Sequence, residues 1–215
     1  MNRATPPPSI DDVLTTKGLP PTGEGRVLIL ACGALAREIR ALLDCCGLTH
    51  IDLQCLPAIL HNHPDRIAPA VEAALVERTG YATRFVAYGD CGTGGALAKV
   101  CAVHGVEMID APHCYAFYEG PSFAVREEID AFYLTDFLAR QFDAFVTRPL
   151  GLDRHPVLRD SYFGNYARLV YLAQTDDPAL DAKARAAADT LGLAYERRAT
   201  GLGPLAQAIG PALHG

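Results

Sequence analysis

The sequence predicts an α/β protein with a doubly wound, mainly parallel sheet and helices on both faces, a Rossmann-like arrangement. Short apolar runs alternate with segments of helical periodicity from residue 26 onward. The first run, RVLILAC, is apolar throughout, which is typical of a strand covered on both faces. Half of the chain is apolar and a fifth is charged, an ordinary globular composition.

The expected elements follow the chain in order. Strands are predicted at 26–32, 49–57, 82–91, 167–174 and 193–200. A further strand that runs into a loop is predicted within 106–115. Helices are predicted at 33–47, from about 64–67 to 80, and at 94–105, 177–192 and 201–213. The aromatic-rich stretch 122–166 is expected to be mostly helical.

The domain organisation follows from composition. Residues 1–25 are rich in proline and glycine and lack periodicity, so they are expected to form a flexible leader. Residues 26–215 are expected to form a single α/β domain, for which a division into two lobes near 120–165 stays open.

Charge and hydropathy exclude several classes of partner. The formal net charge is −6 and there is no basic cluster, which argues against nucleic acid. There is no apolar run near the roughly 20 residues of a spanning helix, and no signal peptide is recognisable, so a cytoplasmic protein is expected. In that compartment the seven cysteines are expected to be thiols or metal ligands rather than disulfides.

Thiol and imidazole groups follow four predicted strands. Cys32 closes the first strand, His61 follows the second, Cys91 closes the third, and His113 and Cys114 follow the fourth. Ligands of open parallel sheets bind beyond the carboxyl ends of the strands, so these groups are expected at one edge. Cys32 and Cys91 share the order strand, cysteine, glycine, helix, and a thiol at a helix N-terminus has a lowered pKa.

The hypothesis drawn from this pattern is a metal site for zinc or iron. Cys32, Cys91 and Cys114 would be ligands, with His61 as a fourth ligand or general base and His113 as a second candidate catalytic group. The alternative is that each cysteine only fills the core, because buried cysteine is common and the spacing is no short-range zinc signature.

The glycine-rich turn GDCGTGG allows a second interpretation. It is neither a Walker A loop nor a dinucleotide fingerprint, but amides near Gly92, Gly94 and Gly95 could approach an anion of a cofactor. Glycines that permit close approach of the turn are the preferred interpretation.

The remaining candidates are expected to be structural. Asn62 is predicted to cap a helix. Packing roles are predicted for Cys45, Cys46, Cys55 and Cys101.

Several long stretches carry a family resemblance: LILACGALAREI, LHNHPDRIAPAVEAAL, VAYGDCGTGG, PHCYAFYEG and FGNYARLVYLAQTDD. Over about residues 26–200 the chain resembles the DUF1638 proteins of methanogens and proteobacteria. The resemblance implies that the family's cysteine and histidine motifs fall on Cys32, His61, Cys91 and His113 with Cys114. Many members read His-Asp-Cys at the last site, whereas His113 and Cys114 are adjacent here.

Similar genes often lie near genes of corrinoid-dependent methyltransferases, so the resemblance implies a role in one-carbon metabolism. It also implies a small-molecule substrate and a corrinoid or methyltransferase protein as partner. Whether the protein forms an oligomer is left open. One hypothesis is an enzyme whose metal activates a thiol for methyl transfer or a water for hydrolysis. The alternatives are a metallochaperone or corrinoid-handling accessory, and a purely structural metal site.

Overall fold

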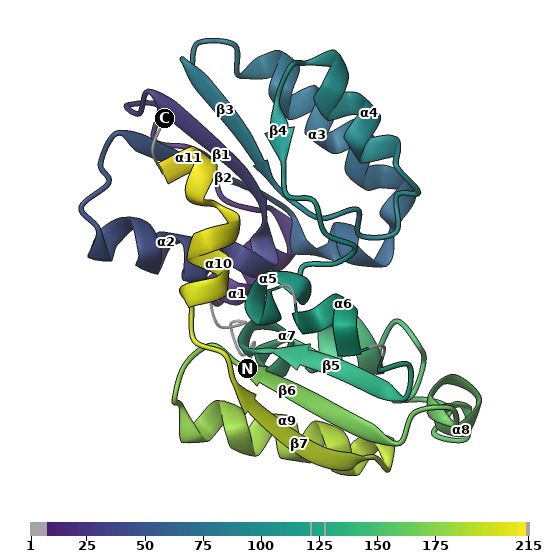
Figure 1. The fold of residues 1–215 in the computed structure, drawn as a ribbon. Coiled ribbons are helices and arrows are strands. Elements are labelled where there is room, and N and C mark those ends of the chain that lie inside the picture. Colours follow the sequence, from purple (N-terminus) through teal and green to yellow (C-terminus); the bar gives the residue numbers. More distant parts are fainter. Residues whose placement is uncertain (1–7, 121, 127, 214–215) are drawn as a thin grey trace, which may run out of the picture.

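The computed structural model describes residues 8–213 apart from residues 121 and 127, and its strands form two parallel sheets (Figure 1). The first sheet has the order β2-β1-β3-β4, built from Ile51–Leu56, Val27–Cys32, Thr83–Ala87 and Glu107–Met108. The second has the order β5-β6-β7, built from Ala131–Thr135, Arg168–Ala173 and Ala194–Ala199. The predicted α/β class with parallel strands is confirmed, with the strands divided between two sheets.

Helices cover both faces of the first sheet. On one face lie α3 (Ile67–Glu77) and α4 (Ala96–Val103), which pack together; α2 (Ala36–Cys45) lies on the other (Figure 1). Short helical turns join them: η1 (Gly33–Leu35), η2 (Ala58–Asn62) and η3 (Pro64–Arg66).

The longest of the described helices, α9 (Pro178–Leu191), lies near the second sheet. It packs on β6 and β7, begins with Asp177 as N-cap and ends at Gly192 in the left-handed conformation. The others are α5 (Ala116–Glu119), α6 (Ser122–Arg126), α7 (Asp136–Arg140), the π-helical turn η4 (Asp143–Thr147) and α8 (Leu158–Phe163).

The chain crosses between the sheets twice. After β7 it returns to the first sheet through α10 (Gly203–Ala208) and α11 (Gly210–Leu213), and α11 contacts β1 and β3 (Figure 1). We call residues 8–115 and 201–213 the first lobe and the described residues of 116–200 the second lobe. Helices α1, α5 and α7 lie between the two sheets.

The core explains which predicted strands are central. All six residues of β1 are buried, as its continuous apolar pattern requires, and β6 is buried from Leu169 to Ala173. β7 pairs with one neighbour only and is largely open to solvent. Among the described residues, none of the helices is long and apolar enough to cross a membrane.

The leader expected over residues 1–25 needs correction for its described part. Residues Ile10–Thr16 form α1, whose N-terminus is closed by a capping box between Ser9 and Asp12. Leu14 is 2 % exposed, and Leu19 pairs with Cys55 beside β2. Composition did not predict this helix, because the capping box and one buried leucine stabilise it although prolines surround it in the sequence. Residues 1–7 lie outside the described residues.

Two further predictions about elements were wrong in detail. Residues 131–135 lie in the stretch expected to be mostly helical, but they form β5. The run AFYLT is short and apolar, and periodicity alone cannot separate a buried strand from a helix at that length. β4, the strand expected to run into a loop within 106–115, is only two residues long, and the chain after it forms bends and turns.

Candidate functional site

The candidate site begins at the carboxyl edge of the first sheet. β1 pairs with β2 on one side and β3 on the other, so the connections leave β1 and β3 in opposite directions. A crevice opens at such a switch point. Cys32 is the last residue of β1, and the segment that follows β3 carries Cys91.

Backbone hydrogen bonds bring Cys91 to the segment after β4. The amides of Asp90 and Cys91 donate to the carbonyls of Ala111 (2.8 Å) and Pro112 (2.9 Å). Gly89 makes this approach feasible, because a Cβ at that position would lie 2.6 Å from the Ala111 carbonyl oxygen. As a result the Sγ atoms of Cys91 and Cys114 lie 3.8 Å apart.

The backbone of Cys91 is itself unusual. Its φ is +49°, and it is the one non-glycine residue with positive φ in the part of the chain that the structure describes. Conformations of this kind cost of order 1 kcal/mol or more and cluster at functional sites. The chain therefore holds this thiol in a strained position beside Cys114.

The thiols of Cys91 and Cys114 have different pKa values. The hydrogen bond from the Cys114 side chain lowers the pKa of Cys91, and the same interaction, with burial, raises the pKa of Cys114 well above its ordinary value. Cys91 is thus the thiolate-prone partner and Cys114 the proton donor. Burial raises the pKa of the Cys32 thiol to about 12, so it stays protonated unless a cation displaces the proton.

A small enclosed cavity lies between the two lobes beside these thiols. Its volume is about 20 Å³, and its lining includes Cys32, His61, Cys114 and Tyr118. The second lobe contributes residues at and after the end of β5, including Phe145. A cavity of this size holds about one water molecule or one ion, not an organic substrate.

Two buried tyrosine hydroxyls near this cavity lack hydrogen-bond partners. The Oη atoms of Tyr88 and Tyr118 are fully shielded from solvent and have no partner in the described structure. The Tyr88 hydroxyl is close enough to the Cys32 thiol to lower the pKa of that thiol by hydrogen bonding, although the contact does not have the geometry of a full hydrogen bond. Buried hydroxyls without partners are rare in native proteins and indicate an unaccounted water or ion. No sequence pattern pointed to these two residues, because tyrosine is common in cores.

The two candidate catalytic histidines lie on different cavities. His61, in η2, is open to solvent on one side, and its ring lies edge-on to Phe145 with centroids 6.2 Å apart. The surrounding protein, and to a smaller extent His113, lowers the pKa of His61, so the ring is neutral at neutral pH. His113 instead lines an open pocket outside the thiol cavity and contacts Tyr115 and Phe123. Asn62 caps no helix and donates a long 3.5 Å hydrogen bond to the carbonyl of Phe145.

The described side chains do not form a ready coordination sphere. No group of three or more histidine, cysteine or acidic side chains in the described part of the chain stands close enough together to hold a metal ion as placed. The structure therefore brings Cys91 to Cys114, and places Cys32, His61 and Cys114 on one cavity, without completing the predicted set of four ligands.

Asp90 already occupies the glycine-rich turn. Its carboxylate accepts hydrogen bonds from the amides of Gly94 (3.2 Å) and Gly95 (2.7 Å) and from the Thr93 hydroxyl (2.8 Å). These amides are the donors that a cofactor's anion would need. Gly92, Gly94 and Gly95 all have positive φ, which accounts for glycine at each position without a bound cofactor.

Comparisons with known proteins complete the description of the site. A family model described as a protein of unknown function, DUF1638, matches residues 55–209. The chain belongs to the DUF1638 family. Neither the search of curated proteins nor the search of solved structures found a match. The match to the DUF1638 model contains His61, Cys91, His113 and Cys114, whereas Cys32 and α1 precede it.

Two cysteines of this DUF1638 protein are not the packing residues they were expected to be. Cys45 and Cys46 end α2 and are exposed, with their Sγ atoms 3.5 Å apart. Cys55 and Cys101 are buried, as expected.

Proposed function

We propose that this protein binds a thiophilic metal ion, zinc or iron, through Cys32, Cys91 and Cys114. The observation that carries the proposal is the 3.8 Å separation of the Cys91 and Cys114 sulfurs. Two thiolates bound to one tetrahedral zinc, each at about 2.3 Å, are separated by about 3.8 Å. This pair already has the spacing of one edge of such a tetrahedron.

Cys32 supports the proposal from the other side of the cavity. It lines the same enclosed space as Cys114, and its thiol is protonated in the absence of a cation. A bound metal deprotonates coordinating thiols, which would remove that barrier. The hydroxyls of Tyr88 and Tyr118 would gain an anionic sulfur as acceptor.

His61 supplies the fourth position in this proposal. Its neutral ring can act as a ligand or, one step further out, as a general base. Bound zinc or iron would lower the pKa of a substrate thiol or water, the chemistry that methyl transfer and hydrolysis require. A role in one-carbon metabolism, as enzyme or accessory, is the functional setting that this chemistry fits.

A second function is favoured by the unequal protonation of the pair. A thiolate at Cys91 beside a thiol at Cys114 is the arrangement of a dithiol that reversibly forms a disulfide. A disulfide oxidant, such as oxidised glutathione, would accept the two electrons and two protons that the dithiol loses. Metal content separates this function from the first.

Elemental analysis of protein purified without oxygen tests the proposal. We expect about one zinc or iron per chain in the wild type and a loss of that metal in Cys91→Ser and Cys114→Ser. Cys45→Ser/Cys46→Ser is the matched control, because it removes an exposed pair of similar spacing and should leave the metal content unchanged. Metal-free wild-type protein whose Cys91 and Cys114 oxidise reversibly would favour the dithiol function.

Turnover separates an enzyme from a carrier. An enzyme forms methylated or hydrolysed product from a small-molecule substrate. A metallochaperone or corrinoid-handling accessory passes its metal to a partner without such a product. A structural metal predicts that Cys91→Ser lowers stability alone.

A further inference from the structure

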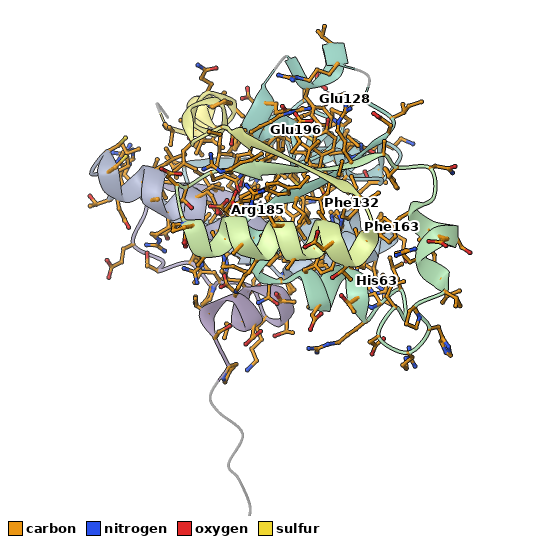
Figure 2. All side chains as sticks on the ribbon, turned by 90° about the horizontal axis from the view of Figure 1, so that it is seen from below. His63, Glu128, Phe132, Phe163, Arg185 and Glu196 are labelled. Carbon is orange, nitrogen blue, oxygen red and sulfur yellow. The ribbon has the colours of Figure 1, made fainter. Side chains whose placement is uncertain are left out.

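A second, larger pocket opens beside the thiol cavity. Its volume is about 480 Å³, and it is lined by Pro112, His113, Tyr115, Phe123, Glu128, Ile129, Ala131, Phe132, Tyr133 and Tyr166. Six of these side chains carry aromatic rings, and Glu128 is the one described lining residue with a full negative charge. Figure 2 shows Glu128 and Phe132 on the second lobe, with Phe132 beside Phe163.

The rings that line the pocket stand at steep angles to one another. Phe123 is tilted by 53° to Tyr133 and by 84° to His113, and Phe132 lies at 69° to Tyr166. The one nearly parallel pair, Tyr115 and Tyr133, has centroids 5.8 Å apart, which leaves no slot for a flat ligand between the rings. A concave wall of angled rings suits a rounded group rather than a planar heterocycle.

Glu128 indicates which charge and which hydrogen-bonding groups a ligand of this pocket can have. Hydrogen bonds and charge from Arg198, Tyr133 and Arg168 lower the pKa of Glu128 to about 2, so it is ionised at neutral pH. Each carboxylate oxygen already accepts two hydrogen bonds: Oε1 from Arg168 and Arg198, and Oε2 from Tyr133 and Arg198. A carboxylate has about four acceptor positions, so none is left for a ligand N–H.

We propose that this pocket binds a quaternary ammonium group. Such a cation is attracted to the faces of aromatic rings and carries no N–H that needs an acceptor. A primary ammonium would lose its water and find the acceptor positions of Glu128 filled. An anion would meet the Glu128 carboxylate and would find no Lys or Arg among the described residues that line the pocket.

The pocket lies next to the thiol site. Tyr115 lines both the open pocket and the enclosed cavity, and His113 and Cys114 are neighbours that line one each. The cavity is too small for an organic substrate, so the open pocket is the adjacent space that has room for one. The binding proposal does not depend on a metal, because none of the described residues that line the open pocket is a cysteine.

Binding of choline, measured by isothermal titration calorimetry on the full chain, tests this inference. The neutral isostere 3,3-dimethyl-1-butanol has carbon in place of the quaternary nitrogen, and ethanolamine keeps a primary ammonium. We expect choline to bind about tenfold more tightly than either. Tyr166→Ala and Phe123→Ala should each weaken choline binding about threefold or more.

Three controls keep the result interpretable. Tyr166→Phe retains the ring and should bind choline like the wild type. Tyr162→Ala removes an exposed ring outside the pocket and should also leave binding unchanged. Circular dichroism checks that each variant is folded. Equal affinity for choline and its neutral isostere, unaltered binding by folded Tyr166→Ala and Phe123→Ala, or no saturable choline binding would each overturn the inference.

Discussion

At the residue scale, the hydrogen bond between Cys91 and Cys114 controls which sulfur is reactive. The thiolate is the nucleophile in alkylation, and Cys114 stabilises the thiolate of Cys91. In metal-free protein we expect iodoacetamide to modify Cys91 before Cys114 at neutral pH. Cys114→Ala should raise the pKa of Cys91 and slow its modification about threefold or more, since each pKa unit is a tenfold change in thiolate population. Site-resolved mass spectrometry over a pH series measures both rates.

The same experiment contains its own reference points. Cys101 is buried and burial raises its pKa, so it should react slowly in wild type and variant alike. Faster modification of Cys114 than of Cys91 in the wild type would contradict the assignment of the proton.

Substitution of Gly89 tests the close approach of chain segments that positions Cys91 beside Cys114. In Gly89→Ala the new Cβ would meet the Ala111 carbonyl oxygen at 2.6 Å, so the two segments must separate. We expect a loss of about 1–3 kcal/mol in the free energy of unfolding, measured by urea denaturation. Gly80→Ala is the control: its Cβ meets nothing within 4 Å, and its unfolding free energy should change by less than about 1 kcal/mol. Equal effects of the two substitutions would show that the contact at Gly89 is unimportant.

The strand-end rule made part of the site predictable at this scale. A cysteine at the end of a buried apolar run identifies Cys32, which ends β1, from sequence. Cys91 was predicted to close the third strand, but β3 ends at Ala87 and Cys91 lies in the turn beyond it. The separation of His113 from the thiol cavity was not predictable, because a one-residue change in a turn alters the direction of a side chain. Nor does sequence reveal the positive φ of Cys91 or the unpartnered hydroxyls of Tyr88 and Tyr118.

At the element scale, an ion-pair network joins α5, β6 and β7 to the residues before β5. Arg198 contacts Glu119, Glu128 and Glu196, and Arg168 contacts Glu128. The pKa of Glu128 is about 2 in the folded protein, below its ordinary value of 4.5. Its contribution to stability is therefore present above pH 4.5 and is lost as the pH falls towards 2.

Glu128→Gln should remove this pH dependence. We expect the variant to be less stable than the wild type near neutral pH, with the difference shrinking as the pH is lowered from about 4.5 to about 2. Urea denaturation at several pH values measures it. Glu77→Gln, at an exposed position with one weak ion pair to Arg78, should show little difference at any pH. A Glu128→Gln deficit that grows on acidification would contradict the assignment.

Helix α1 should behave as part of the folded protein. Leu14 is 2 % exposed and Ile10, on the same helix, is 50 % exposed. We expect Leu14→Ala to lower the free energy of unfolding by about 2–4 kcal/mol and Ile10→Ala by at most about 0.5 kcal/mol. Similar small losses for both would mean that α1 is a loosely attached tail. Composition predicted such a tail because it averages over residues, whereas one buried leucine decides the packing.

At the scale of the whole molecule, the site's position is set by the division of the strands between two sheets, seven strands in the part of the chain that the structure describes. Alternating strands and helices predict parallel sheets, but they do not say how many sheets form. β5 was hidden in an aromatic stretch, so the second sheet could not be recognised. Contacts between the lobes hold the two sides of the site together. The Asn62 side chain donates a hydrogen bond to the carbonyl of Phe145, and Arg140 of α7 forms an ion pair with Asp11 of α1.

The central claim is that the sulfurs of Cys32, Cys91 and Cys114, from three separate segments of the first lobe, bind one metal ion. Titration of the reduced, metal-free protein with cobalt(II) without oxygen tests it most directly, because thiolate-to-cobalt charge-transfer absorption appears only when sulfur binds the metal. We expect saturation at one cobalt per chain, with the band weakened in each of Cys32→Ser, Cys91→Ser and Cys114→Ser and unchanged in Cys45→Ser/Cys46→Ser. A wild-type protein without this band, or a band that survives in the folded variant lacking Cys32, Cys91 and Cys114, would contradict the claim.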